Sequence, residues 1–208
     1  MSTNNACLGV VLAGGLSSRM GQNKAELPRT TEQNMLAYSS ALLQDAGASQ
    51  IVHSINFQST PTSSEQLADN FENLGPLGGI ATTFLKAPHV NGYLFLPVDL
   101  PLLTPACLAK IRQVGELSKT ACHYDDHFLP LYLPRNAMTE LFFSQLLTRL
   151  QNGLATSKKD KSLSIKQMLK QIPNTAIALD AKHKPQLFNC NTPEQWREAN
   201  EQMTIRVS

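Results

Sequence analysis

The sequence predicts an α/β fold in which a mostly parallel, Rossmann-like sheet with a small hairpin lies between two layers of helices. Three observations predict it. Short apolar, β-branched runs alternate with segments of helical periodicity, which is typical of a parallel sheet covered on both faces. The first run ends in the pair Gly14-Gly15, as a buried strand leading into a loop does. Beyond residue 119 the pattern changes to two short runs around the polar turn Asp125-Asp126, which predicts the hairpin.

The first half of the chain contains three predicted strands. Cys7–Leu12 enters the glycine pair, residues 51–56 form the second strand, and residues 92–98 form the third. Between them, the helical pattern of residues 34–45 is closed by Gly47, and residues 79–86 have a second helical pattern. Residues 58–64 are rich in serine and threonine and are predicted to form a loop.

The second half begins with a helix that Thr104 caps and in which Pro105 takes the first position. The hairpin strands are predicted at residues 120–124 and 128–133, and two helices at residues 136–151 and 162–171 flank a polar, exposed loop. A last strand is predicted around residues 186–190. It leads to a final helix, in which Thr192 is the cap residue and Gln195 can complete a capping box.

Composition excludes several classes of protein. With 208 residues and 42% hydrophobic side chains, the chain can build one sizeable core, so we expect a single domain over residues 1–208. The net charge of +2, from 18 basic and 16 acidic residues, leaves no excess to hold nucleic acid by charge alone. No segment approaches a membrane span and the start is polar, so we expect a cytoplasmic protein without membrane contact. The four cysteines are scattered, and we expect them to be reduced and buried.

The strongest chemical signal is the run of residues 12–24, LAGGLSSRMGQNK, directly after the first strand. Glycines let backbone amides approach a phosphate or a base, hydroxyls add donors, and two cations supply the charge that a triphosphate needs. The lysine is not followed by Ser or Thr and the glycine spacing differs, so this is neither a P-loop nor a dinucleotide fingerprint. The run therefore predicts a different kind of anion-binding loop.

Asp99 follows the third predicted strand and therefore lies at the carboxyl edge of the sheet, where open α/β sheets bind ligands. Magnesium is usually bound by one or two carboxylates together with substrate phosphates, so one aspartate facing the first loop is sufficient. The alternative is that Asp99 only caps a turn before Pro101. His123 and His127 could also suggest a metal site, but they lie in the predicted hairpin with no further ligand spaced to complete a zinc shell.

At this point the loop resembles the signature of the molybdenum cofactor guanylyltransferases, a family of nucleotidyltransferases with a nucleotide-diphospho-sugar-transferase-like fold. Three more segments match in the same order, namely residues 75–79 (GPLGG), 97–101 (PVDLP) and 189–194 (NCNTPE). The resemblance implies an enzyme that transfers GMP from GTP to the phosphate of molybdopterin, releases pyrophosphate and uses Mg²⁺. It also implies transient contact with proteins that deliver or accept the molybdenum cofactor.

The resemblance assigns roles to individual residues. Asp69 resembles the acidic residue that pairs with the guanine ring, and Gly14 favours guanine because family members that use CTP tend to have alanine there. Asp99 would hold the metal. The catalytic residues would be Arg19, Lys24 and Asp99. The nucleotide-binding set would be Leu12, Ala13, Gly14, Gly15, Ser17, Lys24, Asp69, Gly75, Pro76, Leu77, Gly78 and Asp99.

Five residues are expected near the acceptor. Asn189 and Asn191 stand after the last predicted strand, where they could contact the metal site or the acceptor phosphate, although Asn191 and Thr192 could simply begin the final helix. The segment of His127 resembles an acceptor-side strand of the family, with Phe128 in place of a proline. Lys161 and Ser162 match a basic loop of the family that borders the acceptor, and the alternative for that loop is a solvated surface segment.

The predicted mechanism needs positioning and charge neutralisation rather than a covalent nucleophile. In it, the acceptor phosphate attacks the α-phosphorus in line. Two other functions stay open from the sequence. One is a related transferase that uses CTP or another acceptor, and the other is a non-catalytic protein that binds a nucleotide or cofactor.

Overall fold

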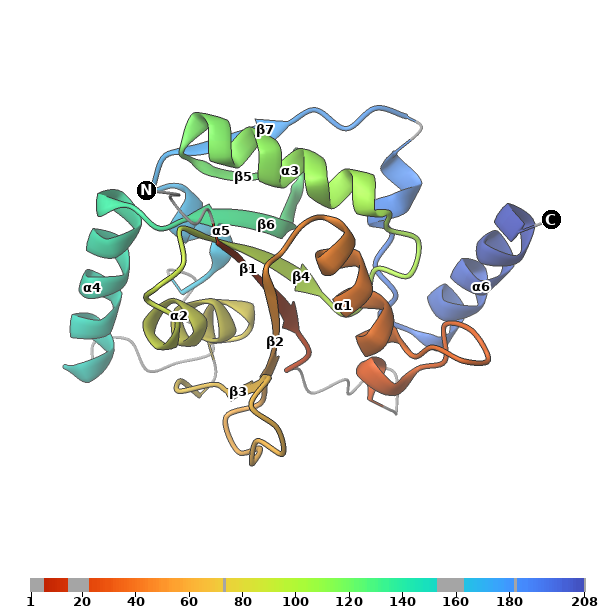
Figure 1. Cartoon of the computed structure of the whole chain (residues 1–208), viewed down its shortest axis with the longest axis horizontal. Helices are drawn as coiled ribbons and strands as arrows, with labels where there is room; N and C mark the ends of the chain where they lie inside the picture. The colour runs from red at the N-terminus through yellow and green to blue at the C-terminus, as the bar shows by residue number, and fades with distance from the viewer. Residues whose placement is uncertain (1–5, 15–22, 73, 153–162, 182, 208) are drawn as a thin grey trace.

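The computed structural model describes residues 6–14, 23–72, 74–152, 163–181 and 183–207. Its strands form one seven-stranded sheet in the order β3-β2-β1-β4-β6-β5-β7, with helices on both faces (Figure 1). The predicted α/β class is therefore confirmed. The strands are β1 (Cys7–Leu12), β2 (Gln50–Ile55), β3 (Gln66–Ala68), β4 (Gly92–Pro97), β5 (Ala121–Tyr124), β6 (His127–Pro134) and β7 (Asn174–Ile177).

The first four strands are parallel, and β6 alone among the described strands runs against its neighbours. β1 pairs with β2 on one side and with β4 on the other, so β1 is central and all six of its residues are buried. β6 pairs antiparallel with both β4 and β5, which confirms the predicted hairpin, and β7 adds to β5 in parallel. The carboxyl ends of β1, β2 and β4 therefore meet at one edge, where ligands of such sheets bind.

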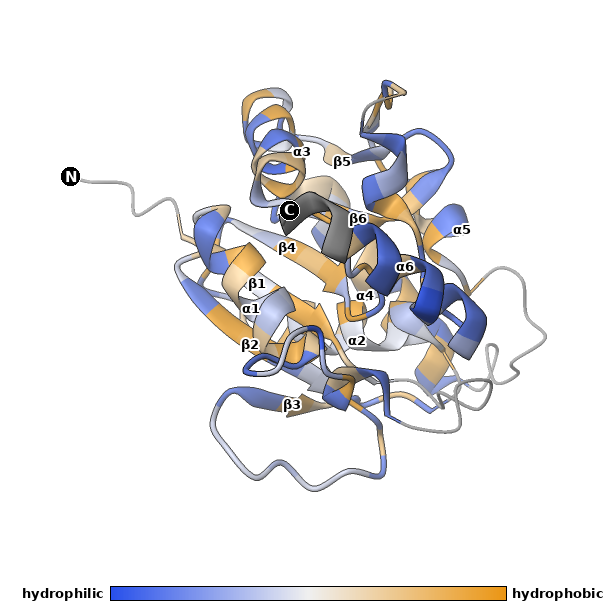
Figure 2. Ribbon diagram, turned by 90° about the vertical axis from the view of Figure 1, so that its right-hand side faces the viewer, coloured by the Kyte–Doolittle hydropathy of each residue, from blue (hydrophilic) through white to orange (hydrophobic). Residues whose placement is uncertain are grey.

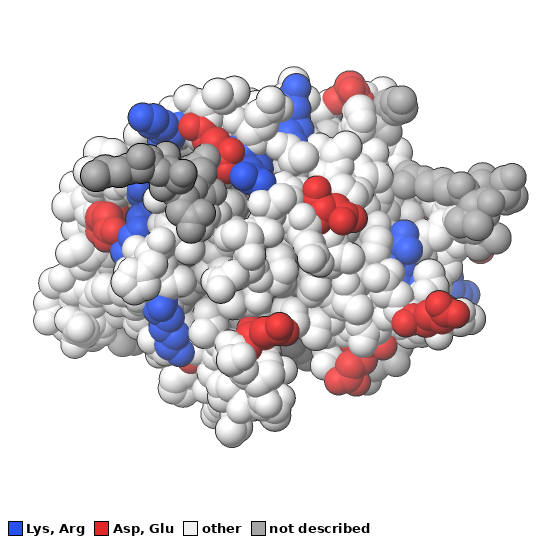
Figure 3. Space-filling view, in the orientation of Figure 1, with Lys and Arg blue, Asp and Glu red and all other residues white. Residues whose placement is uncertain are grey.

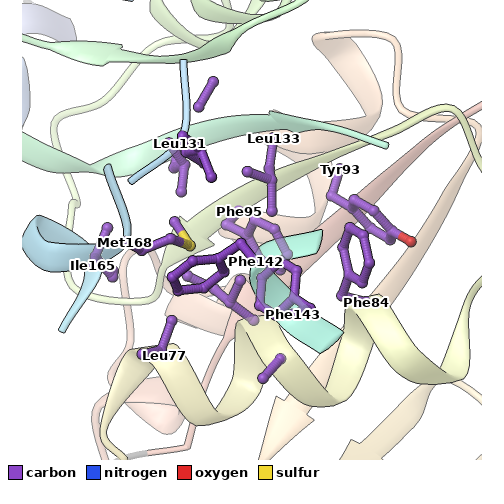
Figure 4. Packing of buried hydrophobic residues seen from close by; sticks show 14 of the residues in the cluster. Leu77, Phe84, Tyr93, Phe95, Leu131, Leu133, Phe142, Phe143, Ile165 and Met168 are labelled. Carbon is purple, nitrogen blue, oxygen red and sulfur yellow. The ribbon is translucent and has the colours of Figure 1, made fainter. Parts of the chain in front are cut away.

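One face of the sheet is covered by α2 (Pro76–Lys86), α4 (Ala137–Gln151) and the short α5 (Ile165–Leu169). Figure 4 shows the aromatic side chains of this layer meeting those of the sheet. Phe84 of α2 stacks on Phe143 of α4 with ring centroids 4.2 Å apart, and Tyr93 of β4 lies 5.5 Å from Phe84. Burial of each such side chain stabilises the fold by roughly 1.5–3 kcal/mol, which fixes α2 against the sheet.

The other face is covered by α1 (Met35–Asp45) and α3 (Pro105–Ser118), whose apolar side chains pack on alternate residues of β1 and β4 such as Val11 and Leu94. The 3-10 helix η2 (Lys184–Leu187) contributes Leu187 to the same cluster. The last helix, α6 (Pro193–Val207), is mostly hydrophilic (Figure 2) and buries Ala199 against Leu102 and Cys190. That third cluster holds the C-terminal segment beside the end of β4.

The segment predicted as the last strand is not a strand. Residues 184–187 form η2, because Pro185 at its start cannot donate to a sheet, and the buried Gln186 side chain accepts hydrogen bonds from Thr104 and Cys107. The last strand is instead β7, which sequence reasoning missed. It missed β3 as well, and α2 begins at Pro76 rather than at residue 79. The predicted helix at residues 162–171 is shorter, because α5 spans Ile165–Leu169 within it.

Surface charge, helix length and the cysteines each bear on an expectation drawn from composition. On the face seen in Figure 3, basic and acidic side chains lie interspersed rather than gathered by sign. Within the described ranges, every helix is too short or too polar to cross a bilayer. All four cysteines are free and buried, as the sequence predicts.

Candidate active site

Three polar side chains that meet at the carboxyl edge come from distant parts of the chain. Lys24 lies in the 3-10 helix η1 (Lys24–Glu26), Asp99 follows β4, and Asn191 precedes α6. The Lys24 ammonium Nζ lies 3.0 Å from Asp99 Oδ2 and 2.7 Å from Asn191 Oδ1. The structure therefore brings together a cation, a carboxylate and an amide that the sequence placed in three separate motifs.

Local packing fixes the position of Lys24. The Asn23 side chain caps η1 by accepting from the amide of Ala25 at 3.1 Å, and Asn23 Nδ2 donates to Glu26 at 2.9 Å. Ala25 and Leu27 are buried on either side of the exposed Glu26. The ammonium is consequently held at the sheet edge by a short helix that is anchored in the core by Ala25 and by Leu27 just after it.

A second set of bonds fixes the loop that carries Asp99. Arg29 Nε donates to the carbonyl of Pro101 at 3.2 Å, and the Arg29 guanidinium lies 3.7 Å from the centre of the Tyr38 ring. The Tyr38 hydroxyl in turn donates to the carbonyl of Leu103. α1 and the segment after η1 are thus tied to the loop at residues 98–104, so the distance between Lys24 and Asp99 is set by the scaffold.

The NCNTPE segment is bound to the same loop through its backbone. The amide of Cys190 donates to the carbonyl of Asp99 at 2.9 Å. Gln195 Oε1 accepts from the amides of Asn191 and Thr192 at 2.7 and 3.1 Å, and the Gln195 amide donates to Thr192 Oγ1 at 3.3 Å. These bonds confirm the predicted capping box, and they show that it also fixes the backbone of Asn191.

Cys190 lies directly beneath this cluster but is unsuited to nucleophilic chemistry. Its side chain is buried, and burial together with the Asp99 carboxylate raises the pKa of the thiol to about 12, although Lys24 opposes the shift. Because the thiolate is the reactive form, Cys190 stays protonated at neutral pH. Its role is packing against α6, as predicted for the cysteines.

The end of β1 is bonded to the end of β2 through one residue, Ser54. The amides of Ala13 and Gly14 both donate to the Ser54 carbonyl, at 3.0 and 2.8 Å. The Gly14 amide is therefore bonded to the neighbouring strand, and a role of Gly14 in nucleotide binding stays a prediction. Gly14 also has a packing reason, because a Cβ there would lie 3.2 Å from the backbone of Ile55. Leu12 is buried in the core, so only its backbone can face a ligand.

Asp69 lies after β3 at the same edge. Its amide donates to the carbonyl of Ile55 at 3.0 Å, and the Ser54 hydroxyl donates to Asp69 Oδ1 at 2.8 Å. Burial raises the pKa of the Asp69 carboxyl to about 6, while the bond from Ser54 and the charge of Lys86 act to lower it. A half-buried carboxyl group whose pKa is shifted by burial and by a neighbouring charge is typical of a functional position.

The GPLGG segment forms the turn into α2 beside Asp69. Gly75 has φ of +56°, which disfavours any residue with a Cβ, and Pro76 takes the first turn of the helix. A Cβ at Gly78 would lie 3.5 Å from Asp69 Oδ2, so the first turn of α2 lies directly beside that oxygen. The side chain of Leu77 is buried and packs in the core, so it cannot project toward a nucleotide.

Of the predicted acceptor residues, His127 lies in the sheet and Asn189 lies in the segment before α6. His127 begins β6, which runs antiparallel to β4, so His127 lies at the same sheet edge as the end of β4. Its carbonyl accepts from His123 Nδ1, which also approaches the carbonyl of Tyr124, so that nitrogen is bonded to backbone. Asn189 is exposed one residue before Cys190. Other predicted site residues lie outside the described residues, namely Gly15, Ser17, Arg19, Lys161 and Ser162.

Two residues at this edge were missed by sequence reasoning. No sequence pattern around Arg29 predicts its role, because its partner is a backbone carbonyl 72 positions away. Ser54 does have a signal. It is a small polar residue that is buried within a strand, and such a residue needs a hydrogen-bond partner.

Comparisons with known proteins agree with this geometry. The family model of the MobA-like NTP transferase domain matches residues 9–162. A molybdenum cofactor guanylyltransferase of Xanthomonas euvesicatoria pv. vesicatoria is 35% identical, with 94% of this chain and 95% of that protein covered. A probable molybdenum cofactor guanylyltransferase of Opitutus terrae is 30% identical, with 93% and 95% covered.

A solved structure has the same fold. The crystal structure of molybdopterin-guanine dinucleotide biosynthesis protein A from Archaeoglobus fulgidus superposes with a TM-score of 0.69 at 19% identity, over 95% of this chain and 99% of that one. The match to the family model covers most of the chain, and the Xanthomonas and Opitutus proteins are similar over nearly all of it. The chain belongs to the MobA-like NTP transferase family.

Proposed function

We propose that this protein transfers GMP from GTP to the phosphate of molybdopterin, giving the guanine dinucleotide form of the cofactor and pyrophosphate. The observation that carries the proposal is the contact of Lys24 with Asp99 and Asn191 at the carboxyl edge of the sheet. A cation and an acidic group facing one another there suit a metal-chelated polyphosphate. The relatives named as guanylyltransferases over nearly the whole chain support the same activity.

The residues present fit a bound Mg²⁺. Among the described residues, no group of three or more His, Cys, Asp and Glu side chains could form a closed metal site. Asp99 offers a carboxylate that is 19% exposed, and Asn191 offers an amide oxygen within the same cluster. Magnesium prefers oxygen ligands and takes few of them from the protein when phosphates supply the rest. Asp99 would hold the ion, which when bound neutralises charge on the triphosphate.

Asp69 supports guanine as the base. An ionised carboxylate only accepts hydrogen bonds. Guanine presents two adjacent donors, N1–H and the 2-amino group, on one edge, whereas adenine, cytosine and uracil each place an acceptor beside their donor. Asp69 Oδ2 lies beside Gly78 in the turn that is proposed to border the nucleotide. A carboxylate at this position therefore favours GTP over the other three triphosphates.

The chain's own residues act by positioning and by charge. Lys24 exchanges its contact with Asp99 for the triphosphate, and its ammonium stabilises the negative charge that develops on the leaving pyrophosphate. An oxygen of the acceptor phosphate attacks the α-phosphorus, and the bond from that phosphorus to the oxygen that bridges it to the β-phosphorus breaks. That oxygen leaves with the pyrophosphate. No side chain forms a covalent intermediate. Arg19 is proposed to share the charge stabilisation.

The remaining residues of the site are assigned by position. The first loop and the GPLGG turn are proposed to enclose the nucleotide between them, with contacts from the backbone where side chains are buried. His127, Asn189, Asn191, Lys161 and Ser162 are proposed to border the acceptor. The cofactor's delivery and recipient proteins are proposed to make only transient contacts, since the acceptor must enter and the product must leave.

The decisive experiment incubates the purified protein with labelled GTP, Mg²⁺ and molybdopterin. We expect stoichiometric pyrophosphate and a labelled product that co-migrates with the guanine dinucleotide cofactor. Parallel reactions with ATP, CTP and UTP test the base. Turnover with CTP in place of GTP would show a related transferase, and GTP binding without any product in a single-turnover reaction would show a non-catalytic protein. Either result would overturn the proposal.

A further inference from the structure

Ser54 makes two contacts that connect the two halves of the candidate nucleotide site. Its carbonyl accepts the amides of Ala13 and Gly14, at 3.0 and 2.8 Å, at the start of the first loop. Its hydroxyl donates to Asp69 Oδ1 at 2.8 Å. One buried residue at the end of β2 therefore bonds to the end of β1 through its backbone and to Asp69 through its side chain.

The Ser54 hydroxyl occupies space that is left free by a glycine of α2. A Cβ at Gly79 would overlap Ser54 Oγ and would lie 3.0 Å from Leu12 Cδ2. The last glycine of the GPLGG segment is therefore required by the packing of α2 on Ser54. α2 can approach β2 closely enough to place Gly78 beside Asp69 only because position 79 has no side chain.

The carboxylate of Asp69 has two oxygens in different situations. Oδ1 accepts the Ser54 hydroxyl, and Oδ2 lies on the side of Gly78. A carboxylate that is fixed at one oxygen has lost most of its rotational freedom about the terminal torsion. The cost of ordering it has then been met before a ligand binds, which favours binding through the other oxygen.

We propose that Ser54 is a positioning residue for base recognition: its hydroxyl fixes the Asp69 carboxylate so that Oδ2 is presented to the donor edge of guanine. This inference rests on the proposed function, and it concerns nucleotide binding rather than the acceptor. Ser54 acts through Asp69 and does not itself touch the nucleotide. Removal of its hydroxyl therefore affects affinity for the base and leaves affinity for the phosphates unchanged.

The test measures equilibrium binding of two ligands, GTP and inorganic tripolyphosphate, each with Mg²⁺, by calorimetry. In Ser54→Ala we expect GTP affinity to fall about tenfold and tripolyphosphate affinity to stay at the wild-type value. Ser49→Ala is the matched control, because it removes a hydroxyl that bonds to the Cys7 carbonyl just before the opposite end of β2. Unchanged GTP affinity in Ser54→Ala, or equal losses for both ligands, would refute the inference.

A double-mutant cycle tests whether Ser54 acts through Asp69. Asp69→Asn should weaken GTP binding, and adding Ser54→Ala to it should cause little further loss. The pH profile gives a second readout. GTP affinity should fall as pH drops through the Asp69 pKa of about 6. In the wild type the bond from Ser54 lowers that pKa, so Ser54→Ala should raise it and the fall should begin at higher pH. Lys86 on α2 is the neighbouring charge and is unchanged in both proteins.

The outcomes also separate this inference from the proposed function. If wild-type protein binds GTP with these mutant effects but yields no product with molybdopterin, the transfer reaction is wrong and the role of Ser54 stands. If the protein turns over GTP normally and Ser54→Ala has no selective effect on GTP binding, the function stands and the role of Ser54 is wrong. Additive losses in the cycle would also overturn the role.

Discussion

Replacing Asp99 by asparagine removes one negative charge from the candidate site and almost nothing else. The two side chains have nearly the same shape. The backbone bond from the Cys190 amide to the carbonyl of residue 99 does not depend on the side chain. Lys24 Nζ also keeps its second partner, Asn191 Oδ1, at 2.7 Å. The substitution therefore isolates the charge of the carboxylate from the packing of the loop.

The expected magnitudes for stability and rate are very different. The Lys24 and Asp99 side chains are 15% and 19% exposed, so their ion pair lies between an exposed pair and a fully buried one. Since Lys24 keeps Asn191, we expect Asp99→Asn to lower the free energy of unfolding by about 1–2 kcal/mol. Loss of the proposed metal carboxylate should lower kcat/KM by at least about a thousandfold, which corresponds to roughly 4 kcal/mol of transition-state stabilisation.

The assay is pyrophosphate release with GTP, Mg²⁺ and molybdopterin, together with urea denaturation of the same preparation. Asp125→Asn is the control, because Asp125 is an exposed carboxylate in the turn between β5 and β6. We expect the control to behave as wild type in both measurements. Wild-type turnover by Asp99→Asn would refute the role of this carboxylate, and unfolding of the variant would show that the charge is structural.

Three further predictions concern individual side-chain contacts. Lys24→Met keeps a long side chain without charge, so tripolyphosphate affinity should fall by roughly tenfold or more, measured by calorimetry. Gly79→Ala should lower the free energy of unfolding in urea by about 1–3 kcal/mol, and by less in a Ser54→Ala background, because the added Cβ overlaps Ser54 Oγ. Gln195→Ala removes the capping box of α6 and should cost about 1 kcal/mol in the same assay; an unchanged midpoint would contradict the cap's contribution.

The sequence predicted the elements that have strong local signals. β1 is a continuous apolar run, α1 ends just before Gly47, α3 begins at Pro105, and the capping box of α6 is visible as residue types. Thr104 stands at the N-cap of α3 as predicted, but its hydroxyl donates to Gln186 and makes no bond to the helix. β3 and β7 were missed because each is short and partly exposed, and each is held by pairing with a distant strand. Such strands are stabilised by tertiary context rather than by composition.

The false strand at residues 186–190 has a different cause. Its apolar residues are indeed buried, with Leu187 in the cluster beneath α1 and α3 and Cys190 against α6. Burial was therefore predicted well, but backbone geometry was not. Gln186 explains the difference, because its side chain bonds to Thr104 and Cys107 and so draws the segment into a turn. A polar residue at the start of an apolar run was the available signal.

The candidate site could be predicted as a list of residues but not as a set of bonds. Lys24 and Asp99 were expected to face each other, and the structure brings them into contact. Asn191 was expected at the metal site or at the acceptor phosphate, and in the structure it contacts the ammonium of Lys24. No local pattern gives that contact, since the two residues are 167 positions apart. Topology provides it by returning the chain to the edge of β4 before α6.

That return has a thermodynamic consequence for the site. Lys24, Asp99 and Asn191 approach one another only when β1 and β4 are paired and when the amide of Cys190 bonds to the Asp99 carbonyl. Gln195 then holds Asn191 from the first turn of α6. The described cluster is therefore a non-local arrangement, and its geometry depends on the C-terminal helix as much as on the first loop. Because local openings of a native protein need less free energy than global unfolding, separation of α6 from Leu102 would disconnect Asn191 while the sheet stays folded.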